Sequence, residues 1–185
     1  PFTNMAMAML MEPGFTSLVK QIVVMGGAAF THGNASPAAE ANILNDPEAA
    51  DIVFGADCPI VMVGLDVTHS INMTRADLAA IGATGSARGL HTAAITDFYA
   101  GFYGSRYGTD GIFVHDSTTI TYLLAPELFT WQELPIRVDT GHSVCRGRTL
   151  AAHRDSDEEG PWFGRRPRSE EHTSELQSHS FISYA

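Results

Sequence analysis

Two short apolar runs along the chain predict buried strands. The run Ile22 to Met25 is closed by Gly26 and Gly27, and Pro59 to Gly64 has the same character. Continuous apolar and β-branched residues bounded by glycine or proline are typical of strands that are covered on both faces. The pattern therefore predicts strands of a parallel sheet with helices on both sides.

Helical periodicity surrounds these runs. The Ala- and Met-rich opening predicts a helix that ends at Pro13, and Asp46 with Pro47 marks the start of another that continues to Phe54. Further helices are predicted over 74–81 and 90–107. In the longer one, apolar and aromatic residues at helical spacing predict a face packed in the core: Ile95, Phe98, Tyr99, Phe102 and Tyr103.

The rest of the pattern completes an α/β fold. The segment 111–129 predicts a short strand and a helix that ends before Pro126, and 134–140 with 148–152 predicts a closing antiparallel pair. Strands that alternate with helices indicate a Rossmann-like open sheet, mixed but mainly parallel, flanked by helices. We expect one domain over residues 1–167. Residues 168–185 resemble translated sequencing-adapter DNA and are expected to be a non-native, disordered tail.

Composition narrows the class of protein. Eleven Lys and Arg against 21 Asp and Glu give a net charge of −10, which argues against a nucleic-acid surface. No apolar run approaches the roughly 20 residues of a membrane-spanning helix. The two cysteines, Cys58 and Cys145, lack metal-binding spacing and indicate a reducing compartment. A cytoplasmic protein is therefore expected.

Polar side chains concentrate in the segment Gly33 to Asp46, which follows the first predicted strand. Asn34, Glu40 and Asn42 supply two amides and one carboxylate, and the carboxyl ends of parallel strands are where open α/β sheets bind ligands. Amides both donate and accept hydrogen bonds, so the set suits a sugar. Asparagines that only complete turns are the alternative.

A second polar pair, His115 and Asp116, follows a short predicted strand. Adjacent residues at a strand end point in different directions, so the imidazole can exchange a proton near neutral pH while the carboxylate binds a cation or a hydroxyl. An ordinary strand-end pair is the alternative. Asp66 and His69, after the second buried strand, are interpreted as structural and left outside the site.

The motifs together resemble one family. The run VVMGGAAFTHGNASPAAEANILNDPEAADIVF, followed by PIVMVGLDVTH and VHDS, is similar to the inosine-uridine preferring nucleoside hydrolases in order and spacing, from FTN to about Arg154. The resemblance implies the nucleoside hydrolase fold, a dimer or tetramer, and hydrolysis of purine or pyrimidine ribonucleosides to ribose and free base. The family's Asp-rich DxDxGxDD motif is absent from this sequence. We therefore expect a truncated, inactive fragment of an active parent.

The resemblance also implies roles for individual residues. Asn34, Glu40 and Asn42 would hold ribose hydroxyls, and His115 would give a proton to the leaving base. Asp116 would bind Ca²⁺ and substrate, with the main-chain carbonyl of Thr3 as a further metal ligand. The calcium would lower the pKa of a bound water, which a carboxylate then deprotonates.

Some features of the sequence leave the base and sugar contacts, and the function itself, open to other interpretations. Tyr103 and Tyr107 match an aromatic segment that covers the base in the family, whereas Ala41 replaces a common aromatic residue beside the sugar. A non-catalytic module that binds ribose or a nucleotide is the main rival, although Met25-Gly26-Gly27 lacks the GxGxxG spacing. A gene-assembly artefact without stable function is the third possibility.

Overall fold

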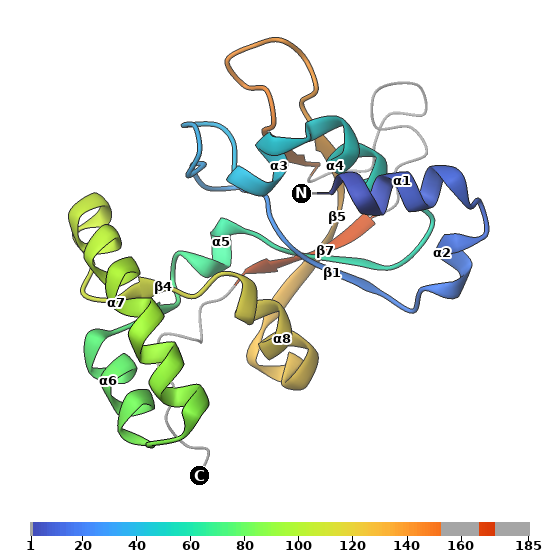
Figure 1. The fold of residues 1–185 in the computed structure, drawn as a ribbon. Coiled ribbons are helices and arrows are strands. Elements are labelled where there is room, and N and C mark those ends of the chain that lie inside the picture. Colours follow the sequence, from blue (N-terminus) through green and yellow to red (C-terminus); the bar gives the residue numbers. More distant parts are fainter. Residues whose placement is uncertain (1, 153–166, 173–185) are drawn as a thin grey trace.

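A mixed sheet forms the centre of the protein, of which the computed structural model describes residues 2–152 and the backbone of 167–172. Its order is β1-β2-β7-β5-β6 (Figure 1). β1 (Ile22–Met25), β2 (Ile60–Val63) and β7 (Pro167–His172) are parallel. β5 (Thr130–Val138) is antiparallel to β7 and to β6 (Thr149–Ala151). Both apolar runs form strands and the closing antiparallel pair is present, as predicted, but only β2 is fully buried, whereas Val23, Val24 and Met25 of β1 are half-buried.

The expected start of the tail, residue 168, falls inside β7, whose backbone pairs with β2 and β5. The remaining residues of that segment, 173–185, lie outside the described part of the chain. The expectation of a non-native tail therefore stays a prediction.

Helices cover the sheet from two sides (Figure 1). On one side lie α1 (Thr3–Met11), α2 (Phe15–Leu18), α3 (Ala41–Asn45) and α4 (Pro47–Phe54), and on the other lies α8 (Asp116–Leu124). Asp46 caps α4 by accepting a hydrogen bond from the Ala49 N–H, with Pro47 in the first turn as predicted. Phe54, Met62 and Ile136 are fully buried between the sheet and the first group of helices.

A helical hairpin projects from the sheet (Figure 1). It follows α5 (Leu65–Thr68) and consists of β3 (Asn72–Met73), α6 (Arg75–Ala83), α7 (Ala87–Tyr107) and β4 (Ile112–Phe113), with β3 and β4 antiparallel. A 3₁₀ turn, Pro126–Leu128, links α8 to β5. α7 is the longest helix described, and no helix in the described ranges has the length and apolar character needed to cross a bilayer.

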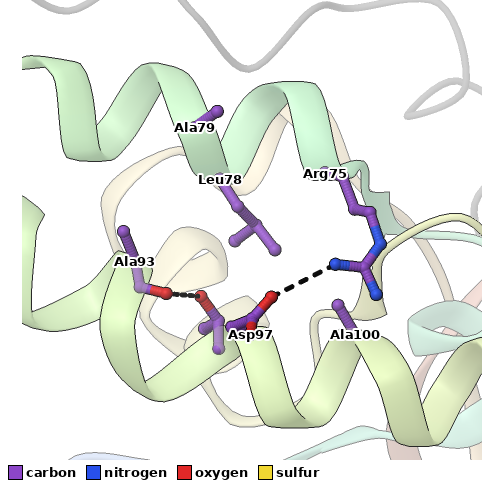
Figure 2. Close-up of a pocket in the computed structure, with 7 residues that line it drawn as sticks. Arg75, Leu78, Ala79, Ala93, Asp97 and Ala100 are labelled. Atoms are coloured by element: carbon purple, nitrogen blue, oxygen red, sulfur yellow. Dashed lines mark hydrogen bonds and ion pairs between the residues drawn. The ribbon is translucent and has the colours of Figure 1, made fainter.

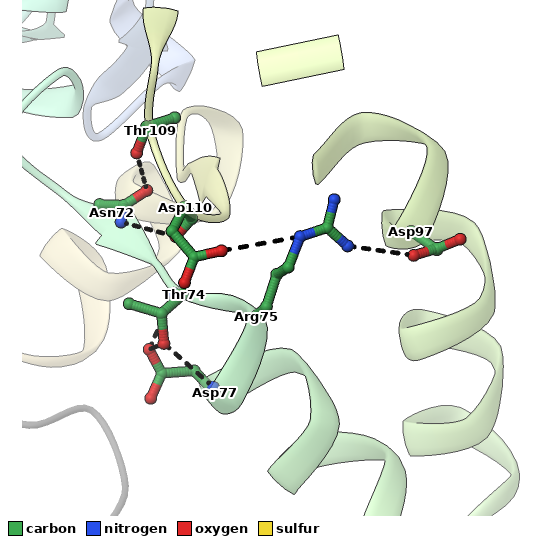
Figure 3. A network of polar contacts seen from close by, with 7 residues as sticks. All are labelled: Asn72, Thr74, Arg75, Asp77, Asp97, Thr109 and Asp110. Carbon is green, nitrogen blue, oxygen red and sulfur yellow. Dashed lines mark hydrogen bonds and ion pairs between the residues drawn. The ribbon is translucent and has the colours of Figure 1, made fainter. Parts of the chain in front are cut away.

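Polar contacts hold the base of the hairpin together (Figure 3). Arg75 on α6 forms ion pairs with Asp97 on α7 at 3.3 Å and with Asp110 after α7 at 3.6 Å. Thr74 and Asp77 form a capping box that begins α6. These contacts lie at the surface, so each contributes only a few tenths of a kcal/mol, at most about 1.

The predicted core face of α7 is wrong. Phe98 is 79% exposed and Tyr99 55% exposed, because α7 packs against α6 through a different stripe of small residues that includes Thr96 and Ala100. Between the two helices this stripe lines a surface pocket of about 170 Å³ that Arg75 and Asp97 border (Figure 2). None of the predicted site residues lines this pocket. A second difference is that residues 41–45, expected as loop, form α3.

The partly buried ion pair between α4 and β5 supplies a stability prediction. Asp51 accepts hydrogen bonds from Arg137 Nε at 3.0 Å, from Arg137 Nη2 at 3.2 Å and from the Val138 N–H at 3.0 Å. We expect Asp51→Ala to lower the free energy of unfolding by about 2–4 kcal/mol, because a buried N–H and a guanidinium lose their acceptor. Urea unfolding measures this change.

Asp97→Ala is the matched control. Its carboxylate pairs with Arg75 but is 82% exposed, so its loss should change the free energy of unfolding by less than about 1 kcal/mol. Equal effects of the two substitutions would contradict the ranking.

Candidate functional site

The predicted polar loop, Gly33 to Asp46, lies at the carboxyl end of β1, and hydrogen bonds to Glu40 hold it there. One carboxylate oxygen, Oε2, accepts hydrogen bonds from the N–H groups of Gly27 and Ile43, both at 3.1 Å, and Oε1 accepts from Asn42 N–H at 2.8 Å. Glu40 is 2% exposed and is the N-cap of α3. The carboxylate therefore joins the end of β1 to the start of α3, in addition to any contact with a ligand.

Burial of this carboxylate affects its ionisation. Desolvation raises the pKa of Glu40 above its ordinary value of 4.5, and the three backbone hydrogen bonds oppose that rise. The negative charge of Asp116 raises it further. The pKa of Glu40 thus responds to the charge of Asp116, which belongs to the second predicted polar pair.

Asn34, in the loop, and Asn42, in α3, each have one of their two amide atoms, oxygen or nitrogen, in a hydrogen bond within the protein. Asn34 Oδ1 accepts from the Ala41 N–H at 2.9 Å, and Asn42 Nδ2 donates to the Met25 carbonyl at 3.2 Å. The partners are 7 and 17 residues apart in the chain, so these bonds join separate segments and are not the local turn bonds that the alternative interpretation expected. The Asn34 Nδ2 and Asn42 Oδ1 atoms have no partner among the residues that the structure describes, so one donor group and one acceptor remain for a ligand.

His115 lies at the start of α8 in a cluster of rings. Its Nδ1 is 2.8 Å from the Thr68 hydroxyl oxygen, and its Nε2 is 3.1 Å from the Tyr103 hydroxyl oxygen. Tyr103 stacks on Tyr107 with ring centroids 5.5 Å apart and planes 29° apart, and Phe113 packs edge-on against Tyr103. The predicted aromatic pair and the predicted imidazole are therefore in contact.

His69 joins the same cluster. Its ring centroid is 5.8 Å from that of His115 and 5.0 Å from that of Phe113. Asp66, in contrast, accepts hydrogen bonds from the Ala29 and Phe30 N–H groups at 3.0 and 2.8 Å. The structural interpretation thus describes Asp66, whereas His69 lies beside a predicted site residue.

Burial keeps the cluster uncharged at neutral pH. Desolvation, followed by the nearby His69, lowers the pKa of His115 to about 4, and desolvation also lowers the pKa of His69. Desolvation raises the pKa of Tyr103. His115 therefore faces the site as a neutral imidazole, not as the readily titrating group that the sequence suggested.

The loop and the ring cluster meet through the end of α7. Arg106 Nη2 donates to the Asn34 main-chain carbonyl at 3.1 Å, and its Nε donates to the Tyr107 hydroxyl at 3.1 Å. The guanidinium also lies 5.5 Å from the centre of the Tyr107 ring. One side chain thus touches both the polar loop and the aromatic pair.

The two predicted metal ligands, Asp116 and Thr3, have different surroundings. The Asp116 carboxylate has no hydrogen-bond partner among the described residues, which leaves it available to a cation. Thr3 begins α1, and its hydroxyl is hydrogen-bonded to Asp46, an interaction that lowers the pKa of Asp46. No group of three or more His, Cys, Asp or Glu that could hold a metal occurs within residues 2–152 or 167–172. These residues do not by themselves fit a complete calcium site.

Sequence reasoning omitted three residues that contact the predicted set: Thr68, His69 and Arg106. Thr68 and His69 follow β2 as the polar loop follows β1. Because neighbouring parallel strands end at the same edge of a sheet, this position was a usable signal. Arg106 gave no such signal, since only the fold brings α7 to the loop.

Comparisons with known proteins agree with this geometry. The family described as "Inosine-uridine preferring nucleoside hydrolase" matches residues 1–175. The chain is 41% identical over 172 residues to "Probable uridine nucleosidase 1" of Oryza sativa subsp. japonica, covering 90% of this chain and 52% of that protein. It thus spans about half the length of the curated relatives it matches.

Solved structures give the same result. A plant nucleoside hydrolase, the PpNRh1 enzyme, superposes with a TM-score of 0.89 at 36% identity, over 94% of this chain and 55% of the other. A purine-preferring ribonucleoside hydrolase from Gardnerella vaginalis superposes with a TM-score of 0.81 at 31% identity, over 92% and 52%. The α/β fold predicted from the sequence is confirmed.

The raised pKa of Glu40 predicts how stability depends on pH. A carboxyl group whose pKa is higher in the folded state stabilises the fold fully below its unfolded pKa and loses that contribution as the pH rises through the folded pKa. From about pH 4.5 upward, the free energy of unfolding of the wild-type protein should therefore fall relative to that of Glu40→Gln. Urea unfolding of both proteins measures the difference. It is done between about pH 4 and 8, a range in which a carboxyl group with a raised pKa titrates.

The total fall relative to the variant should be about 1.4 kcal/mol for each unit by which the pKa is raised. The Gln side chain also loses one acceptor for a backbone N–H, and this effect is constant with pH. Parallel pH profiles for the two proteins would contradict the raised pKa.

Proposed function

The chain belongs to the inosine-uridine preferring nucleoside hydrolase family, and on this premise we propose that the intact protein hydrolyses the N-glycosidic bond of ribonucleosides, giving ribose and a free purine or pyrimidine base. One observation carries the proposal. At the carboxyl edge of β1 and β2, a loop with unused amide groups adjoins a cluster of stacked aromatic and imidazole rings. A nucleoside has a matching polar sugar and flat base.

The polar loop is the proposed ribose side. Asn34 Nδ2 can donate to a hydroxyl oxygen and Asn42 Oδ1 can accept a hydroxyl hydrogen. Glu40 Oε1 accepts a single described hydrogen bond, from Asn42 N–H, and retains room for a hydroxyl hydrogen. The Glu40 carboxylate also fixes both ends of the loop, so the amides are oriented before substrate binds.

The ring cluster is the proposed base side. Tyr103 and Tyr107 offer faces on which a base can stack, and His115 is proposed to assist departure of the base. Because the His115 pKa is about 4, the ring acts at neutral pH as a hydrogen-bond donor through one N–H, not as an imidazolium. Asp116 is the next residue, and its charge acts on the pKa of Glu40 on the proposed ribose side.

We also propose that the intact protein binds Ca²⁺ through the Asp116 carboxylate and the Thr3 main-chain carbonyl. Calcium takes about 6–8 oxygen ligands, so most must come from residues other than those described. The bound ion would supply an activated water. The Asp-rich motif that the sequence lacks is the natural source of further carboxylates, and we therefore propose that this chain alone is inactive.

The setting of the intact protein follows from the same features. Both cysteines, Cys58 and Cys145, are free thiols, which supports a reducing, cytoplasmic location. The exposed aromatic residues of α7, Phe98 among them, support a homo-oligomer. Light scattering of the intact protein that returns a monomer would overturn the second proposal.

A chimera tests the proposed function. The 185-residue chain and a fusion that adds an amino-terminal segment with the Asp-rich DxDxGxDD motif are assayed with uridine and inosine, with calcium present. We expect hydrolysis by the fusion alone, because only it has the missing carboxylates. Ligand binding by both proteins without hydrolysis by either would favour the rival, a non-catalytic ribose-binding module, and hydrolysis by the shorter chain would refute its inactivity.

Two variants of the fusion locate the activity. Asp116→Asn should lower kcat/KM by roughly 10²–10³, the effect of losing one well-placed charged group in a site. Asp97→Asn, at an exposed carboxylate on the outer helical hairpin, should leave it within about twofold of the parent. Similar losses in both variants would show instability rather than a local role for Asp116.

A further inference from the structure

We propose that Thr68 is a positioning residue for His115: its hydroxyl donates to Nδ1 and so holds the imidazole in the tautomer that carries hydrogen on Nε2. The tautomer follows from geometry, whereas its meaning for catalysis rests on the proposed function.

The argument begins with the hydroxyl hydrogen of Thr68. Thr68 is fully buried as the last residue of α5, and its oxygen is 2.8 Å from His115 Nδ1. No other acceptor for this hydrogen is present in the described portion of the chain. An unsatisfied buried hydroxyl costs about 1–3 kcal/mol. Donation to Nδ1 avoids that cost, whereas an Nδ1–H tautomer would point a second hydrogen at the same oxygen and leave the hydroxyl hydrogen unpaired.

The protonation state of Nδ1 determines whether Nε2, the other ring nitrogen, donates or accepts a hydrogen bond. A neutral imidazole has one N–H, so an acceptor at Nδ1 means a donor at Nε2. Nε2 is 3.1 Å from the Tyr103 hydroxyl oxygen. His115 therefore donates to Tyr103, whose own hydroxyl hydrogen has no acceptor among the described residues and is free for a bound molecule.

The opposite tautomer would reverse this direction. With Nε2 unprotonated, Tyr103 would donate to His115 and could offer only lone pairs to a ligand. A nucleobase that leaves as an anion needs hydrogen-bond donors at its carbonyl oxygens and ring nitrogens. The Thr68 hydroxyl bonds the ring nitrogen opposite to the one that faces Tyr103. It thus decides whether the Tyr103 hydroxyl donates a hydrogen bond to a ligand or only accepts one.

The other neighbours of the ring do not compete for its nitrogens. Phe113 and His69 pack beside the His115 ring with centroids 6.2 and 5.8 Å away, and no hydrogen bond from either to His115 is found in the described structure. Rotation of the ring is limited by these contacts. Thr68 therefore selects the tautomer within an orientation that packing has already restricted.

Nuclear magnetic resonance measures the tautomer directly. The ¹⁵N-labelled 185-residue chain is studied at neutral pH by long-range ¹H–¹⁵N correlation of the imidazole nitrogens, with His115→Gln identifying the signals. We expect Nε2–H to exceed Nδ1–H by roughly fivefold or more, as one net hydrogen bond provides. In Thr68→Val this preference should be lost, and Thr68→Ser, which keeps the hydroxyl, should restore it.

Thr96→Val is the matched control, because Thr96 is also a buried threonine but its hydroxyl donates to the Thr92 carbonyl. It should leave the His115 tautomer unchanged. A wild-type ring that is mainly Nδ1–H overturns the proposal, whether or not Thr68→Val folds. So does an unaltered ratio in a folded Thr68→Val protein.

The outcome is independent of the hydrolase assay. An inactive fusion together with the expected tautomer ratios would remove the proposed function and leave Thr68 as the residue that orients His115. An active fusion with the opposite tautomer would do the reverse.

Discussion

The site depends on the buried carboxylate of Glu40. Three backbone N–H groups, from Gly27 at the end of β1 and from Asn42 and Ile43 in α3, converge on its two oxygens. Without the carboxylate these donors would be buried and unpaired, and the chain between them would lose both anchors. A Cβ atom at Gly26 would approach Glu40 Oε2 to 3.3 Å, so glycine at this position leaves room for the carboxylate.

Further packing builds on this anchor. Gly33 lies so close to the Ala39 backbone that a Cβ atom would approach its oxygen to 2.2 Å, and Gly147 has a positive φ of 80° where the later loop passes over Leu44. Both contacts form only when the loop and α3 have the positions that Glu40 fixes. The backbone of the polar loop therefore packs against itself and against α3, and this packing fixes the backbone that carries the amides.

Local sequence signals predicted most of the fold, since they reflect interactions over short distances. The apolar runs of β1 and β2 need to be buried on both faces, and Asp46 with Pro47 satisfies the start of α4 within four residues. Asn34, Glu40 and Asn42 were proposed as ligand groups because such groups follow parallel strands, and their role stays a prediction. The core face of α7 was predicted wrongly because periodicity identifies a stripe but not its partner, and here Thr96 and Ala100 pack instead. The position of His69 after β2 was a local signal, whereas the contact of Arg106 with Asn34 joins residues far apart in the chain and no local pattern encodes it.

The two halves of the candidate site belong to differently attached parts of the protein. The amide of Asn34 lies in the loop after β1 and that of Asn42 lies in α3, next to the sheet. Tyr103 and Tyr107, in contrast, lie on a hairpin joined to the body by β3, β4 and surface contacts such as that of Arg106. Substitutions inside the hairpin can alter its tilt or length while the sheet edge stays as it is. Over evolutionary time, such a division lets recognition of one half of a ligand diversify while recognition of the other half is inherited unchanged.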